Sequence, residues 1–234
     1  MTSRPALMLR GVARRMKWHP KTINRLMGNR KEEAFARHLF AAARSGDVAW
    51  DIGAFQGWYT VPLSDAVGPN GHVFSFEPNA LNRARIDEKA ADRSNTTVLP
   101  IALGNACGAV NFVERGAHSR VVADDDAADV AAVRMATGDS LIESGEAAQP
   151  SVLKIDAEGL EYDLLKGLGG ALGAPCLRAI VMEIHFRLLQ ERHATDDIPA
   201  KIVALLRSHG FRTRWIGASH LLAQRDGGGA SRPN

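Results

Sequence analysis

The segment 48–60, VAWDIGAFQGWYT, constrains the fold of this chain more than any other stretch. An apolar strand ends here at an acid, Asp51, and the chain then passes through Gly53, Ala54 and Gly57 into a helical pattern. Residues with a small side chain, or with none, let the backbone approach a ligand closely. The segment therefore predicts a strand–turn–helix unit of an α/β protein, with a ligand at the turn.

The acid at the end of this strand indicates which ligand the turn binds. A dinucleotide-binding turn follows the pattern G-x-G-x-x-G and places a pyrophosphate on the helix N-terminus. Asp51 would repel phosphate, whereas a cofactor with an ammonium or sulfonium group and no phosphate fits better. The turn thus points to S-adenosylmethionine, and a tight turn without any ligand is the alternative.

Strand and helix patterns alternate along most of the chain. This alternation predicts a mostly parallel sheet with helices on both faces. The predicted strands are 48–51, His72–Phe76, 96–101, 151–155 and 177–182, with a closing hairpin formed by 211–216 and His220–Gln224. The predicted helices are 32–44, 57–67, 80–91, 159–168 and 196–209.

The segment 104–150 is less regular. Its pattern predicts strands over 109–113 and 130–135, a surface loop from Asp124, and a short helix over 139–144. We expect this insertion to carry substrate specificity or to extend one edge of the sheet.

Several predicted strands end in acids. In an open α/β sheet, ligands bind at the carboxyl ends of the strands, so Asp51, Glu77 and Asp156 should line one crevice. Glu77 ends the second strand, where a carboxylate can accept two hydrogen bonds from a ribose diol. The sequence therefore predicts that Glu77 holds the ribose of the cofactor.

The last two parallel strands supply candidate catalytic groups. Asp156 emerges from an apolar strand and Glu158 follows it, whereas Glu161 has the position of an ordinary carboxylate at a helix start. Glu183 and His185 close the next strand and, being two residues apart, should face the same side. A histidine with a pKa near physiological pH beside carboxylates is a candidate general base for a hydroxyl proton.

Four of these side chains could also hold a divalent metal, although no spacing among them is diagnostic. They are Asp156, Glu158, Glu183 and His185. The two cysteines, Cys107 and Cys176, have neither a metal-like spacing nor a secretory context. The sequence thus predicts no dedicated metal site.

The N-terminal segment is strongly basic. Nine Lys or Arg residues and no Asp or Glu lie between Met1 and Lys31, interspersed with apolar residues. The segment could contact an acidic membrane surface, a nucleic acid or an acidic partner, or it could be a helical cap with solvated basic side chains. We expect a basic helical extension over 1–45, one domain over 46–225 and a disordered tail over 226–234.

No stretch approaches the roughly 18 consecutive apolar residues that span a bilayer, and no signal-peptide pattern is present. These features predict a soluble, cytoplasmic protein.

Four motifs, taken together and in this order along the chain, resemble those of a known protein family. DIGAFQGWYT, FSFEPN, LKIDAEGLE and MEIH resemble the FkbM-type S-adenosylmethionine-dependent methyltransferases, and the resemblance covers 48–224. It implies the class I methyltransferase (Rossmann-like) fold, with a mostly parallel seven-stranded sheet, an antiparallel last strand and helices on both faces. It also implies O-methylation of a hydroxyl on a sugar, natural product or similar metabolite.

The resemblance also implies roles for individual residues. The family commonly has Asn after Gly-Ala where this chain has Phe55, and the missing amide is expected to weaken or reshape cofactor binding. The expected catalytic residues are Asp156, Glu158, Glu183 and His185. The expected cofactor-binding residues are Asp51, Gly53, Ala54, Phe55, Gly57, Tyr59, Thr60, Glu77, Pro78, Asn79, Ala102 and Asp156.

Two other functions are compatible with the sequence. A nucleic-acid methyltransferase would use the basic N-terminal arm and would bind in a salt-sensitive way. The rest of the chain is not basic and has no evident aromatic stacking cluster, which makes nucleic acid the weaker hypothesis. A non-catalytic binding module that keeps the fold is the other alternative, and Phe55 motivates it.

Overall fold

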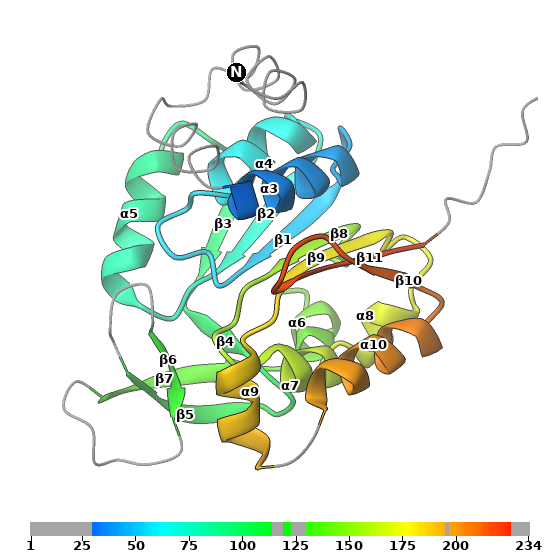
Figure 1. Ribbon diagram of the computed structural model, residues 1–234. Coiled ribbons are helices and arrows are strands. Elements are labelled where there is room, and N and C mark those ends of the chain that lie inside the picture. The colour runs from blue at the N-terminus through cyan, green and yellow to red at the C-terminus, as the bar shows by residue number, and fades with distance from the viewer. Residues whose placement is uncertain (1–29, 114–118, 123–129, 195–196, 226–234) are drawn as a thin grey trace, which may run out of the picture.

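A computed structural model describes residues 30–113, 119–122, 130–194 and 197–225 (Figure 1). The basic segment before Arg30, the predicted loop from Asp124 and the predicted tail lie outside these residues, so the three-part division of the chain stays a prediction. None of the described helices is long and apolar enough to cross a membrane.

The core of the molecule is a seven-stranded sheet with the strand order β10-β11-β9-β8-β1-β2-β3. The five strands from β9 to β3 pair in parallel, and β11 pairs antiparallel with both of its neighbours. This topology confirms the predicted fold class and the antiparallel last strand. The strands are β1 (Val48–Ile52), β2 (His72–Phe76), β3 (Thr96–Leu99), β8 (Val152–Ile155), β9 (Ala179–Glu183), β10 (Arg212–Trp215) and β11 (His220–Gln224).

Helices cover both faces of this sheet because alternate strand residues point to opposite sides. Ala49 packs under α3 (Arg30–Ala42) and α4 (Thr60–Val67), whereas Trp50 belongs to the larger core on the other face. That larger core includes residues of α6 (Gly138–Glu143), α7 (Glu161–Lys166), α8 (Gly169–Gly173), α9 (Phe186–His193) and α10 (Ile198–Ser208). The remaining helix, α5 (Ala80–Ala90), contacts β3 and α4.

A second, four-stranded sheet has the order β4-β7-β5-β6. Its strands are β4 (Ile101–Leu103), β5 (Gly108–Val113), β6 (Arg120–Val122) and β7 (Val130–Ala136). The single strand predicted over 96–101 is wrong, because the chain passes from β3 to β4, and so from one sheet to the other, at Pro100. Proline has no N–H to donate to a strand ladder, which favours a break there.

Two helices that the pattern did not predict are short, with five residues in α8 and eight in α9. The α8 sequence, GGALG, contains three glycines, which have low helix propensity. In α9 only Leu189 is buried, and most of the other residues in this helix are polar or charged. The predicted helix at Gly57 begins later, at Thr60, because Gly57 has a φ of +74° and forms part of the turn.

Candidate active site

A cavity of about 420 Å³ opens at the carboxyl ends of β1, β2, β8 and β9, and residues of the second sheet line its other side. The insertion 104–150 therefore contributes directly to the cavity wall. Of the residues predicted to bind the cofactor, those that line the cavity are Gly53, Phe55, Glu77, Pro78, Ala102 and Asp156. All four predicted catalytic residues, Asp156, Glu158, Glu183 and His185, line it as well.

Glu77 is held rigidly at the end of β2. One carboxylate oxygen accepts a hydrogen bond from the Phe55 backbone N–H at 2.8 Å, and the other accepts one from the Asn79 N–H at 2.9 Å. Burial raises the pKa of this carboxyl, and the two backbone N–H groups partly oppose the shift. Asn79 itself does not line the cavity, because its side chain caps α5 by accepting a hydrogen bond from the Asn82 N–H.

The turn after β1 depends on glycine at one position. Gly53 has a φ of +70°, and a Cβ there would lie 1.8 Å from the carbonyl oxygen of Asp156. Any side chain at Gly53 would therefore push apart the ends of β1 and β8, which are the two strands that meet beneath the cavity.

Phe55 adopts a backbone conformation that its side chain disfavours. Its φ is +50°, in the left-handed region, where Gly, Asn and Asp are tolerated best. The Asn that the family resemblance leads one to expect at this position would fit that conformation, so this chain carries local strain in its ligand-binding turn.

We expect Phe55→Asn to stabilise the protein by about 1 kcal/mol, since it relieves a left-handed conformation in a bulky residue. It should also strengthen cofactor binding, because the N–H that anchors Glu77 is then presented without strain. Urea unfolding and calorimetric titration with S-adenosylmethionine measure the two effects. Phe55→Leu is the control, since it makes the side chain smaller but keeps the strained backbone conformation. Equal stability of Phe55→Asn and Phe55→Leu would contradict the explanation.

Asp51 lies beneath the turn and does not line the cavity. The strand alternation points its side chain toward α3 and α4, where it is 0% exposed. Its carboxylate accepts a hydrogen bond from Thr60 Oγ1 at 2.7 Å and pairs with Lys154 Nζ at 3.2 Å. The expected direct contact with a cofactor thus stays a prediction, while the structure gives Asp51 a buried supporting position.

Lys154 connects this acid to the ligand-binding turn. Its ammonium group donates to the Gly53 carbonyl at 2.6 Å and lies 3.7 Å from Asp156. Burial favours the neutral amine, but Asp51 and Asp156 outweigh that effect and raise the pKa of Lys154. The lysine is therefore charged and fixes the turn from below.

The remaining residues predicted to bind the cofactor support the turn from behind. Ala54 is buried, Gly57 packs against Ile86, and Thr60 is engaged with Asp51. The Tyr59 hydroxyl donates to Glu32 at 2.7 Å, so this tyrosine orients a residue that does line the cavity.

His185, which immediately precedes α9, is surrounded by carboxylates. Its Nδ1 lies 2.7 Å from a carboxylate oxygen of Glu161, and its Nε2 lies 3.7 Å from Asp156 and 3.6 Å from Glu158. Burial favours the neutral ring, but the hydrogen bond to Glu161 and the charges of the three acids outweigh it and raise the pKa of His185 to about 9. The premise of a pKa near physiological pH is therefore wrong, and the ring is mainly protonated at pH 7.

Glu161 lies at a helix start, as the sequence predicts, but its burial and its contact with His185 were not predicted. The residue is 0% exposed, and besides facing His185 it accepts a hydrogen bond from the Gly159 N–H at 3.1 Å. Its position at a helix start is equally typical of a solvated capping residue. Only the packing of α7 near His185 distinguishes a solvated capping carboxylate from a buried one that contacts the histidine.

The predicted metal-ligand set separates into two groups in the described part of the chain. Potential ligand atoms of Asp156, Glu158 and His185 lie within 4.8 Å of one another. Glu183 instead belongs to a different group with Glu32 and His220. Neither Glu32 nor His220 was among the predicted site residues, since each comes from a distant segment and shows no motif of its own.

A sequence-family comparison matches the described site to a known domain. The model of the methyltransferase FkbM domain matches residues 51–213, which include all the strand-end acids discussed above. This chain belongs to the FkbM methyltransferase family. This is a family of S-adenosylmethionine-dependent methyltransferases, so the predicted family and cofactor are confirmed.

Two curated relatives of this FkbM-family chain are methyltransferases. Hexuronic acid methyltransferase AglP of Haloferax volcanii is 32% identical over 165 residues, which are 70% of this chain and 66% of AglP. Protein-L-isoaspartate O-methyltransferase of Ignicoccus hospitalis is 38% identical over 61 residues, covering 25% of this chain and 29% of that protein. The chain thus spans slightly less than two thirds of the first relative and under one third of the second.

Solved structures share the fold of this family member. A methyltransferase FkbM from Methylobacillus flagellatus has a TM-score of 0.53 at 15% identity, covering 94% of this chain and 58% of that one. Precorrin-6y C5,15-methyltransferase from Geobacter metallireducens has a TM-score of 0.50 at 14% identity, covering 84% and 87%. At these identities the likeness establishes the fold alone.

The chemistry of the cavity fits S-adenosylmethionine. Among the described residues, its lining contains the carboxylates of Glu32, Glu77, Asp156, Glu158 and Glu183, against the cationic groups of Arg120 and His185. An acidic wall favours a ligand with sulfonium and ammonium groups and disfavours one with phosphates. Anchored at the mouth of the turn, Glu77 would hold the ribose, and the backbone at Gly53 and Phe55 would border the rest of the cofactor.

Proposed function

We propose that this family member transfers the methyl group of S-adenosylmethionine to a hydroxyl of a sugar or a similar hydroxylated metabolite. The observation that carries the proposal is that one cavity contains both the ligand-binding turn with Glu77 and the charged group formed by Asp156, Glu158 and His185. A hydroxyl placed between them would meet proton-accepting groups beside a methyl donor. The name of the relative AglP, a hexuronic acid methyltransferase, supports a sugar acceptor.

The bound cofactor supplies an electrophilic methyl group, and the chain supplies position and proton transfer. Residues of the second sheet, including Phe112 and Val121, line the cavity and supply an apolar part of its wall. Either Asp156 or Glu158 would accept the hydroxyl proton. Burial raises the pKa of Asp156, although Lys154 and His185 partly oppose this, which makes its carboxylate a stronger base than usual.

His185 then has a role that suits a protonated ring. With Nδ1 held by Glu161, its Nε2–H faces the space between Asp156 and Glu158. From there it would donate a hydrogen bond to the acceptor oxygen and stabilise the negative charge that develops as the proton leaves.

A methyl-transfer screen tests the proposal. The full-length chain is incubated with methyl-labelled S-adenosylmethionine and neutral sugars, uronic acids, oligosaccharides and polyols, each with and without EDTA. Mass spectrometry identifies methylated products, and NMR locates the methyl group. Methyl ether formation on a hydroxyl is the expected result. Transfer exclusively to nitrogen, or to the carboxylate of a uronic acid, would overturn the assignment of a hydroxyl acceptor.

His185→Ala is expected to lower kcat by about 10²- to 10⁴-fold, because the transition state loses a charged hydrogen-bond donor. The dissociation constant for S-adenosylmethionine should change little, since Glu77 and the turn are untouched. Steady-state kinetics and calorimetry measure the two quantities. The matched control is His209→Ala, at the end of α10 and away from the cavity lining. A comparable loss of cofactor affinity in His185→Ala would contradict this role.

A further inference from the structure

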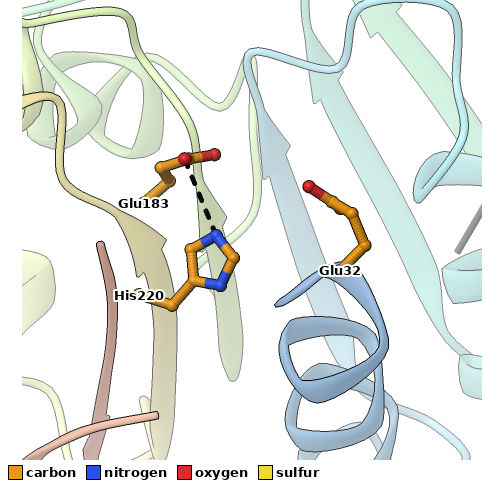
Figure 2. A group of neighbouring side chains, drawn as sticks. All are labelled: Glu32, Glu183 and His220. Atoms are coloured by element: carbon orange, nitrogen blue, oxygen red, sulfur yellow. Dashed lines mark ion pairs between the residues drawn. The ribbon is translucent and has the colours of Figure 1, made fainter. Parts of the chain in front are cut away.

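A second group of charged side chains lies on the cavity wall, apart from His185. Glu32 comes from the first turn of α3, Glu183 from the end of β9, and His220 from the start of β11. Figure 2 shows a nitrogen of the His220 imidazole next to the Glu183 carboxylate, with the Glu32 carboxylate extending toward them from α3. One ligand atom from each residue lies within 4.8 Å of the other two. Strand register brings Glu183 opposite His220, and the packing of α3 on β9 and β11 adds Glu32.

His220 is almost completely buried and is poorly satisfied. Its exposed fraction is 2%, and Nδ1 has no hydrogen-bond partner among the residues that the structure describes. Its Nε2 lies 3.7 Å from Glu183 Oε1, which is longer than a hydrogen bond. A buried polar group without a partner costs roughly 1–3 kcal/mol. Nε2, which lies toward Glu183, is the nitrogen that an ion held by that carboxylate would bind, whereas Nδ1 lies beside Gly217.

Hydroxyl groups of the protein orient both carboxylates, and Glu183 also forms a long ion pair with His220. The Tyr59 hydroxyl donates to Glu32 at 2.7 Å, and the Ser219 hydroxyl donates to Glu183 at 3.2 Å. Within the described residues, neither carboxylate forms an ion pair with a lysine or arginine. In metal sites, surrounding hydrogen bonds commonly orient the ligand side chains, and the two hydroxyl groups orient these carboxylates in the same manner. Both glutamates also line the cavity, so an ion between them would be accessible.

We infer that Glu32, Glu183 and His220 form a binding site for a divalent transition-metal ion such as Zn²⁺. Two carboxylates and one imidazole are a mixed oxygen and nitrogen set that suits such ions better than Ca²⁺ or Mg²⁺, which prefer oxygen alone. Three protein ligands leave a fourth position open toward the cavity. Because the ligands come from α3, β9 and β11, the ion would also tie α3 to the sheet. The inference does not depend on methyl transfer.

Calorimetric titration of the metal-stripped, full-length chain with ZnCl₂ tests this site, and MgCl₂ serves as the comparison ion. We expect saturable Zn²⁺ binding that is much tighter than Mg²⁺ binding, together with a higher Tm in the presence of Zn²⁺. Each of Glu32→Gln, Glu183→Gln and His220→Gln should weaken Zn²⁺ binding at least about tenfold, since each removes one ligand. Should His220→Gln fail to fold, Glu32→Gln still provides the test, because that side chain is only partly buried.

Two control variants locate the ion. Glu33→Gln changes the neighbouring residue of the same helix turn and should bind Zn²⁺ like the wild type. Glu158→Gln alters the other potential ligand group and should leave the affinity of the Glu32 site intact. Absence of saturable Zn²⁺ binding would overturn the inference. So would an affinity that falls in Glu158→Gln and stays unchanged in Glu32→Gln.

Discussion

Asp51→Asn is expected to lower the free energy of unfolding by about 3–5 kcal/mol, because it leaves the charge of Lys154 buried without its closest charged partner. Asp51 and Lys154 are 0% and 2% exposed, so water cannot compensate for the lost carboxylate. Asp156 lies farther away, at 3.7 Å, and is partly exposed. Urea unfolding followed by circular dichroism measures the loss.

A double variant distinguishes a lost charge partner from simple damage to the strand. Asp51→Asn combined with Lys154→Met removes both charges and should recover much of the stability, since a buried ion pair replaced by groups of similar volume is often close to neutral. The exposed pair of Arg85 and Glu88 supplies the control, and Glu88→Gln should change the unfolding midpoint little.

The same variants test the sequence-based role of Asp51. Suppose that Asp51→Asn has the same urea midpoint of unfolding as the wild type but no longer binds S-adenosylmethionine. Asp51 then contacts the cofactor directly, as the motif predicted. A large loss of stability, recovered in the double variant, would assign it to the support of the turn.

Glu77→Gln is expected to weaken the binding of S-adenosylmethionine by a factor on the order of 10². A carboxylate that accepts hydrogen bonds from two ribose hydroxyls contributes about 1.5–3 kcal/mol for each, and a neutral amide loses part of both. The neighbouring backbone is already arranged for this ligand, because the N–H groups of Phe55 and Asn79 fix the carboxylate. Calorimetric titration measures the change in affinity.

The control for this variant is a change of ligand. An S-adenosylmethionine analogue with a 2′,3′-dideoxyribose should bind Glu77→Gln and the wild type with similar, weak affinity, since it has no diol to recognise. An equal loss of affinity for both ligands would mean that Glu77 acts only by holding the backbone of Phe55, and the ribose assignment would then be incorrect.

Much of the fold could be predicted because it depends on local patterns. Apolar runs that end in acids and alternate with helical segments require a parallel sheet, and the hairpin closed by His220–Gln224 gave the antiparallel strand. The division of 96–101 at Pro100 was missed because both halves are apolar and extended. The first half, β3, pairs with β2, whereas the second half, β4, joins the other sheet by pairing with β7, more than 30 residues later in the chain.

The candidate site divides in the same way. Glu77 and Asp156 could be placed at the cavity because a strand end has a fixed position at the edge of the sheet. The direction of the Asp51 side chain could have been questioned from strand alternation, but its partner Lys154 lies on another strand. The Asp51 carboxylate pairs with Lys154 inside the protein and does not face the cavity, and this depends on how the two strands pack and not on the residue type.

By itself, the sequence determined the family through motifs contiguous in the chain, and the resemblance to that family implied the sheet topology. The ends of the predicted strands indicated the edge of the sheet at which the cavity opens. Only the tertiary structure decided that Glu161 raises the pKa of His185 to about 9, and that Glu32 and His220 join Glu183. The physical reason is that a pKa and a ligand group depend on distances of a few ångströms between side chains. Packing brings those side chains together from segments far apart in the sequence.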